Sequence, residues 1–398
     1  MALREIQLSN KFKGPGFLYR RDFYDRDIEG SLSSFTPGEW GLLKGDGQDR
    51  LLVMVNHLAQ LGPKIRAVTT WKNEFKDLSD WEILKTLIDR SIYKRSLFKN
   101  LKDGSRLIYG EADQLPGLVV DCYVNAVVVQ INSAGIDRFR AQIKDYLQEK
   151  TNRTAILFDQ PEYRKAEALP LFPLQGQLPD PIIIKENQFT FELPLGVVQK
   201  LGHYYDHRVN RNKLEQAVLN FNGSLKNGLD LFCYSGAWGM SALRAGMENM
   251  TFIDQGAFKE VILNNLKNNN LEERGDFVRD DVFDYLEQSL SQNKQFDLII
   301  SDPPAFSKNL KNKSKALIGY EKLHTSCLKL LKSNSLFAVA SCTHGISHDE
   351  LDRTVLEATK KSGKKVSLID VGVQGQDHPF GHLQDSSFYI KYLLYFVE

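Results

Sequence analysis

Residues 296–306 place a carboxylate, two prolines and an aromatic ring directly after an apolar run. Such an unbroken apolar run is typical of a strand buried on both faces of a parallel sheet. Because proline lacks an N–H donor and fixes φ, the two prolines predict the end of this strand. Asp302 and Phe306 are therefore expected at the carboxyl end of a central strand, where open α/β sheets bind their ligands. An enzyme could hold a flat, hydrogen-bonding ring such as a nucleobase at that position.

A cysteine follows the next predicted strand in the same way. Residues 336–341 form an apolar run, and Cys342 comes directly after it. In a doubly wound sheet with short connections this strand neighbours the one that ends at Asp302, so both side chains can face one crevice. A thiolate that adds to C6 of a cytosine turns C5 into a nucleophile, and an acid beside N3 accepts the developing charge. The pair therefore predicts methylation of a pyrimidine carbon.

The same residues allow two other interpretations. Asp302 could accept a hydrogen bond from a base that is methylated on nitrogen, and Cys342 would then be a core residue. A non-catalytic RNA-binding assembly factor could also have kept the fold. An ordinary thiol is mostly protonated at neutral pH, so the C5 chemistry requires a group that activates Cys342. His344, two residues further on, is a candidate for that group, although a surface histidine without a catalytic role is the commoner case.

Acidic residues also stand at the ends of the preceding strands. Asp230 lies within the end of the first strand, and Asp254 ends the second, 18 residues beyond Gly236. The loop after Asp230 differs from the dinucleotide fingerprint G-x-G-x-x-G, because Tyr234 takes the place of the first glycine. Each acid alone could be a helix N-cap, but acids at successive strand ends favour a nucleoside with a positive centre and no phosphate. S-adenosylmethionine (SAM) has these properties, and Asp281 after the third strand could reach its adenine amine.

The order of the expected elements divides the chain into three domains. Residues 1–75 alternate short apolar runs with turn signals, which predicts a small β-rich domain. Residues 76–190 combine a helix at 81–99 with a strand pair around the turn at 124–125, which predicts an α+β middle domain. From residue 191 to 398, strands alternate with helices, which predicts a doubly wound, mainly parallel α/β sheet. Its strands are expected at 228–232, 250–254, 276–279, 296–301, 336–341, 366–371 and 388–396.

Composition excludes several classes of protein. The 398 residues carry a net charge of +1, so the chain is not a globally basic nucleic-acid binder. Four cysteines in so long a chain form no disulfide framework, and no C-x-x-C pair indicates a zinc site. No apolar run has the length of a membrane span or a signal peptide, so a cytoplasmic location is the default expectation. Lysines at 308, 311, 313 and 315 form a basic cluster directly after the Asp302 strand end.

These motifs, in this order, resemble the bacterial large-subunit rRNA methyltransferase I family of PUA-containing, SAM-dependent cytosine-C5 RNA methyltransferases. The resemblance is carried by residues 106–121, by residues 199–208, by the strand-end acids, by residues 341–342 and by residues 377–379. It implies a Rossmann-like class I methyltransferase domain, SAM as cofactor, RNA (23S rRNA in this family) as partner, and a homodimer. His207 stands where the family usually has glutamine, and Ala237-Trp238 is bulkier than the small residues common in the family.

Motifs and resemblance together predict the following site residues. Cys342 and Asp302 are expected to be catalytic, and no metal ligand is predicted. Residues expected at the cofactor are Gln199, Lys200, Gly202, Tyr205, Arg208, Asp230, Phe232, Tyr234, Ser235, Gly236, Asp254, Asp281, Asp302 and Pro303. Residues expected at the substrate are Pro304, Phe306, Lys308 and Lys311.

Overall fold

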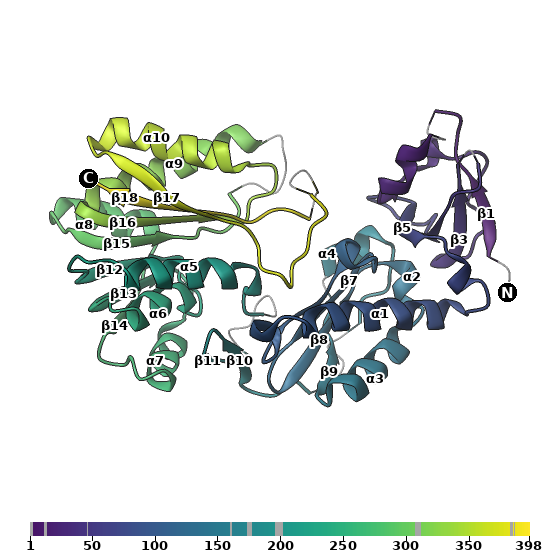
Figure 1. Ribbon diagram of the computed structural model, residues 1–398, viewed down its shortest axis with the longest axis horizontal. Coiled ribbons are helices and arrows are strands. Elements are labelled where there is room, and N and C mark those ends of the chain that lie inside the picture. Colours follow the sequence, from purple (N-terminus) through teal and green to yellow (C-terminus); the bar gives the residue numbers. More distant parts are fainter. Residues whose placement is uncertain are drawn as a thin grey trace. The chain divides into compact units, whose positions relative to one another are not determined.

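The computed structural model divides into two compact units, each assembled from separate stretches of the chain (Figure 1). The first contains Met1–Ile182 and Gln376–Gly381, and the second contains Ile183–Gly375 and His382–Glu398. The structure describes residues 3–11, 14–45, 47–159, 161–172, 177–195, 202–306, 312–382, 385 and 387–398. The predicted division into three domains stays a prediction. Among the described helices, none is both long and apolar enough to cross a membrane.

The first unit begins with a small five-stranded sheet in the order β1-β3-β4-β5-β2. Its strands β3, β4 and β5 form an antiparallel meander, and β1 pairs with β3 in parallel. The strands are β1 (Arg4–Gln7), β2 (Asp22–Phe23), β3 (Glu39–Lys44), β4 (Arg50–Val55) and β5 (Ile65–Thr70). This sheet has the β-rich character that residues 1–75 predict.

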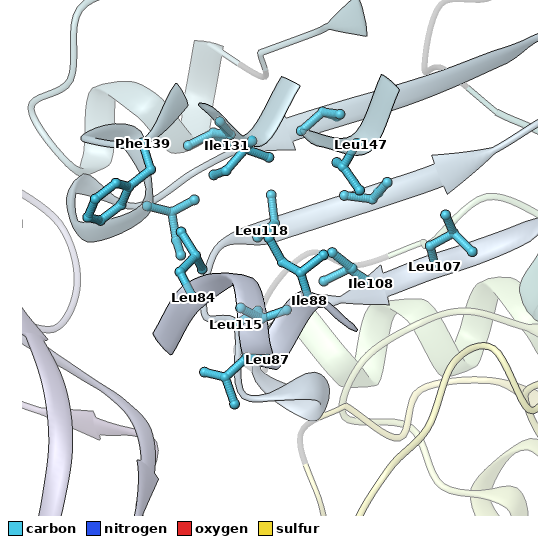
Figure 2. Packing of buried hydrophobic residues seen from close by; sticks show 14 of the residues in the cluster. Leu84, Leu87, Ile88, Leu107, Ile108, Leu115, Leu118, Ile131, Phe139 and Leu147 are labelled. Atoms are coloured by element: carbon cyan, nitrogen blue, oxygen red, sulfur yellow. The ribbon is translucent and has the colours of Figure 1, made fainter. Parts of the chain in front are cut away.

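A second sheet in the first unit has the order β6-β7-β8-β9. The hairpin of β7 and β8 confirms the strand pair that the sequence predicts around residues 124–125. The strands are β6 (Ser105–Tyr109), β7 (Leu118–Cys122), β8 (Ala126–Ile131) and β9 (Thr154–Leu157), and the helices are α1 (Asp80–Ser96), α2 (Ala134–Asp137), α3 (Arg140–Thr151) and α4 (Pro161–Ala166). Leu84 and Ile88 of α1 pack toward Ile108 and Leu118 of this sheet (Figure 2).

Helix α1 starts where its capping residues place it. The Ser79 hydroxyl accepts a hydrogen bond from the Glu82 amide, and the Glu82 carboxylate accepts one from the Ser79 amide, which is a capping box. The helix ends at Ser96, three residues before the end that the sequence predicts, and a short 3-10 turn at Lys99–Leu101 follows.

The second unit is built on a seven-stranded sheet in the order β14-β13-β12-β15-β16-β18-β17. Five neighbouring strands, from β14 to β16, pair in parallel, and β18 lies antiparallel between β16 and β17. A separate hairpin of β10 (Ile182–Glu186) and β11 (Phe189–Leu193) precedes it. The sheet strands are β12 (Asn227–Leu231), β13 (Asn249–Asp254), β14 (Gly275–Arg279), β15 (Phe296–Ser301), β16 (Leu331–Ser341), β17 (Val366–Gly372) and β18 (Lys391–Val397).

Helices cover both faces of this sheet, with α9 and α10 on one face and α5, α6 and α7 on the other (Figure 1). They are α5 (Arg208–Leu219), α6 (Ala237–Arg244), α7 (Lys259–Asn268), α8 (Val282–Ser291), α9 (Lys313–Leu330) and α10 (His348–Ser362). The doubly wound, mainly parallel α/β fold is therefore confirmed. Because β12 lies between β13 and β15, the strand order reverses at β12, and ligands bind at such a switch point.

Candidate active site

The loop between β12 and α6 holds three residues in the left-handed region. Phe232 has φ 60°, Tyr234 has φ 46° and Gly236 has φ 82°. Two non-glycine residues in this region are costly, and such strain concentrates at functional sites. The φ of Gly236 favours glycine at this helix start, and a Cβ there would also lie 2.8 Å from the Ile262 Cδ1, which would have to shift.

Asp230 lies beneath this loop at the switch point and is fully buried. Its Oδ2 accepts a hydrogen bond of 2.8 Å from the Gly239 amide in the first turn of α6. Its Oδ1 is buried and has no hydrogen-bond partner among the described residues. Burial raises the pKa of this carboxyl well above its usual value, and the charges of Asp302 and Asp254 raise it further. A buried acceptor with a free lone pair is a place where a ligand can donate a hydrogen bond.

The other two strand-end acids already bind backbone amides. Asp254 accepts from the Tyr234 amide at 3.2 Å and from the Gly256 amide at 2.9 Å. Asp281 is the N-cap of α8, where it accepts from the Phe283 amide at 2.8 Å. For Asp281 the structure therefore shows the capping role that the sequence allows as an alternative, and its contact with adenine stays a prediction.

Asp302 follows β15 and is held by an indole. The Trp238 Nε1 donates a hydrogen bond of 2.9 Å to its Oδ2. The His207 Nε2 lies 3.8 Å from its Oδ1. The Trp238 ring stacks on Tyr392, with centroids 5.5 Å apart, so the donor itself is fixed. Trp238 and His207 therefore both lie next to the Asp302 carboxylate.

Cys342 follows β16, and β16 pairs in parallel with β15. This confirms the predicted neighbouring strands. Burial raises the pKa of the Cys342 thiol to about 12, and the charges of Asp302 and Asp206 raise it further, whereas Lys391 lowers it. The other three cysteines are buried.

Aromatic rings lie beside the two strand ends. Phe306 packs on Tyr320 with centroids 4.7 Å apart and on Phe283 at 6.5 Å. The Tyr320 hydroxyl lies 2.8 Å from the hydroxyls of both Ser341 and Thr343, which flank Cys342. Tyr320 therefore connects the predicted ring-binding residue Phe306 with the backbone that carries the thiol.

Comparison with known sequences identifies the family. A family model described as conserved hypothetical protein 95 matches residues 208–369. Ribosomal RNA large subunit methyltransferase I of Shewanella amazonensis is 32% identical over 297 residues, which are 73% of this chain and 74% of that protein. The chain belongs to this family. The protein of the same name from Serratia proteamaculans is 33% identical over 297 residues and 73% of each chain.

Solved structures show the same fold. A candidate SAM-dependent methyltransferase from Streptococcus mutans superposes with a TM-score of 0.75 over 99% of this chain and 100% of that chain, at 20% identity. A candidate methyltransferase complexed with SAH has the same TM-score and coverage at 21% identity. At this identity the likeness establishes the Rossmann-like architecture.

Of the remaining residues predicted at the cofactor or the substrate, some are described by the structure and others are not. Tyr205 and Arg208 are buried at the start of α5, and the Arg208 guanidinium lies 4.5 Å from the Tyr205 ring centroid. Gly202 accepts a hydrogen bond of 3.2 Å from the Tyr234 hydroxyl, and Ser235 is buried in the same loop. Pro303 is buried and Pro304 is exposed. Gln199, Lys200, Lys308 and Lys311 lie outside the described residues.

Sequence reasoning missed two groups beside the thiol. Lys391 of β18 is buried and interacts electrostatically with Cys342. Its signal in the sequence is a single lysine inside an otherwise apolar strand. Asp206 accepts a hydrogen bond of 2.5 Å from the Tyr389 hydroxyl, a pairing that 183 positions separate and that no local pattern reveals. His344, the candidate activator, stacks on Tyr389 instead, with centroids 5.1 Å apart.

Proposed function

We propose that this protein methylates C5 of a cytosine in RNA, with SAM as methyl donor and Cys342 as nucleophile. The observation that carries the proposal is the position of Asp302 and Cys342 at the carboxyl ends of neighbouring parallel strands. Asp302 follows the strand next to the switch point at β12, where open α/β sheets bind ligands, and Cys342 follows the strand after that. Large-subunit ribosomal RNA is the proposed substrate, because the curated relatives carry that substrate in their name.

The residues around β12 fit SAM. The unpartnered, buried Oδ1 of Asp230 can accept a hydrogen bond from a positively charged amine. Asp254 at the next strand end can accept from ribose hydroxyls, and Gly236 lets the backbone approach the ligand closely. A solved neighbour of the same fold is complexed with SAH. When bound, SAM supplies an electrophilic methyl group.

The protein residues would act on the base in a fixed order. The Cys342 Sγ forms a bond to C6 of the cytosine, and the electron pair of the C5–C6 double bond becomes available at C5. Asp302 meets the polar edge of the ring, held there by the Trp238 indole. After methyl transfer a base removes the C5 proton, and elimination releases the Cys342 thiolate. A base in a duplex must leave its stack to reach such a crevice.

One observation favours the alternative of base-nitrogen methylation. The pKa of Cys342, raised to about 12, keeps the thiol protonated in the ligand-free protein. Nitrogen methylation needs no thiolate, and Asp302 with Phe306 would then accept from the base and stack on it. A non-catalytic assembly factor is the third possibility, and failure to bind SAM in calorimetry would favour it.

Nucleoside mass mapping separates these functions. Ribosomal RNA from cells with and without the protein is digested, and the methylated nucleosides are compared. The proposal expects 5-methylcytidine at one position to disappear without the protein and to return with the wild-type chain, but not with Cys342→Ala. A Cys122→Ala chain is the matched control, because Cys122 is a buried core residue of the first unit. Loss of an N-methylated nucleoside would overturn the proposal. The PUA assignment, the homodimer and the cytoplasmic location stay predictions.

A further inference from the structure

Lys391 is a buried cation at the first position of β18, with 1% of its surface exposed. Its Nζ donates hydrogen bonds to the carbonyl oxygens of Thr343 and Tyr389, both at 2.6 Å. Among the ion pairs that the described residues form, none includes Lys391. A buried ammonium without a counter-ion is costly. An anion that forms next to Lys391 would therefore be stabilised by it.

The thiol of Cys342 is the group placed to become that anion. After the burial of Lys391 itself, the charge of Cys342 has the largest effect on the pKa of Lys391, ahead of that of Glu350. Strands β16 and β18 pair Ser341 directly with Lys391, so the lysine lies across the sheet from the strand end that precedes Cys342. The carbonyl that it binds belongs to Thr343, the residue after the cysteine.

We propose that Lys391 is the positioning residue that makes Cys342 reactive, by fixing the backbone at residues 342–343 and serving as counter-ion of the thiolate. The inference rests on the proposed nucleophilic role of Cys342. In the activating step the Sγ–H bond breaks, its proton passes to water, and Lys391 keeps its own proton. The ammonium and the thiolate then form a buried pair in which each compensates the charge of the other.

Of the charged side chains that act on Cys342, Lys391 is the one that favours the thiolate. Asp302 and Asp206 both raise the pKa of Cys342, whereas Lys391 lowers it. Burial lowers the pKa of Lys391 to about 8, and a thiolate beside it would hold the proton more firmly. Other titratable groups that interact with one member of the pair are Glu350, Tyr204, Tyr320, His344 and His348.

The pH dependence of Cys342 alkylation tests this inference on the full chain. Iodoacetamide reacts with thiolate, and peptide mass spectrometry reports the rate at Cys342 apart from the other cysteines. Lys391→Gln keeps hydrogen-bond donors for the two carbonyls but carries no charge, and Lys391→Met removes both. Lys391→Arg keeps the charge. Lys360→Met is the matched control, because Lys360 is an exposed lysine of α10 that pairs with Glu357.

The counter-ion role predicts that both uncharged variants alkylate Cys342 about tenfold more slowly at pH 7, because loss of the ammonium raises the pKa of the thiol by about one unit. The difference should shrink above pH 8, because the pKa of Lys391 is lowered to about 8 and its charge is lost there. Lys391→Arg and the control should keep the wild-type rate at pH 7, and an unchanged rate in folded Lys391→Gln would overturn the inference. If Lys391→Met does not fold, the Gln and Arg variants still decide. Alkylation of Cys342 does not depend on which base atom is methylated. If the Lys391 variants slow alkylation as expected but the RNA product is methylated on nitrogen, the proposed function is refuted and the role of Lys391 is not.

Discussion

Replacing Trp238 with phenylalanine isolates the hydrogen bond that orients Asp302. The substitution removes the indole N–H, which donates a hydrogen bond of 2.9 Å to the Asp302 Oδ2, but it keeps an aromatic ring packed on Tyr392. A hydrogen bond to a charged group contributes about 1.5–3 kcal/mol, which corresponds to roughly 10- to 150-fold in rate. Because the His207 Nε2 still lies 3.8 Å from the other carboxylate oxygen, we expect kcat to fall by about tenfold, at the lower end.

Transfer of a labelled methyl group from SAM to unmodified large-subunit rRNA measures this effect, with calorimetry for SAM affinity. We expect kcat to fall while the Kd for SAM changes little, because the indole binds Asp302 and not the β12 loop. Trp71→Phe is the matched control, since Trp71 packs on Phe75 in the first unit. An unchanged kcat in a folded Trp238→Phe protein would show that this hydrogen bond does not position Asp302 for the reaction.

Three further substitutions test individual elements of the structure. Burial raises the pKa of Asp230 in the folded state, so the folded protein loses stability as the pH rises above the pKa that this carboxyl has in the unfolded chain. Without SAM, Asp230→Asn should therefore be more stable than the wild type at pH 8 in thermal unfolding. The same variant should bind SAM more weakly. Gly236→Ala places a side chain at φ 82° and should destabilise the fold by about 1–2 kcal/mol in urea titration, and it should weaken SAM binding. Arg95→Met leaves the Asp113 carboxylate buried without its guanidinium partner, and we expect a loss of about 3–5 kcal/mol on unfolding. Equal stability of the wild type and the variant would contradict each of these expectations.

Strand ends and their order could be predicted because the signals are local. The apolar run and two prolines fix the end of β15 at Ser301, and the strand that precedes Cys342 is equally distinct. The expected final strand began at residue 388, whereas β18 begins at Lys391. Residues 388–390 are as apolar as the strand itself, so hydrophobicity alone does not show where pairing begins.

Contacts between distant residues could not be predicted in the same way. The indole of Trp238 and the carboxylate of Asp302 are 64 positions apart, and only the adjacency of β12 and β15 brings them together. Lys391 reaches Thr343 because β18 inserts antiparallel beside β16, a pairing that the sequence does not encode locally. The capping of α8 by Asp281 could be predicted, because the N-cap and the backbone amides that it binds are neighbours in the sequence.

Covalent trapping tests the central claim most directly. RNA in which the target cytosine is replaced by 5-fluorocytosine cannot lose a proton from C5, so an enzyme that adds a cysteine to C6 remains bound after methyl transfer. With SAM and such RNA, we predict a denaturation-resistant adduct that peptide mass spectrometry locates at Cys342 and that Cys342→Ala does not form. Methyl transfer to RNA by the wild-type protein without any adduct at Cys342 would contradict the account.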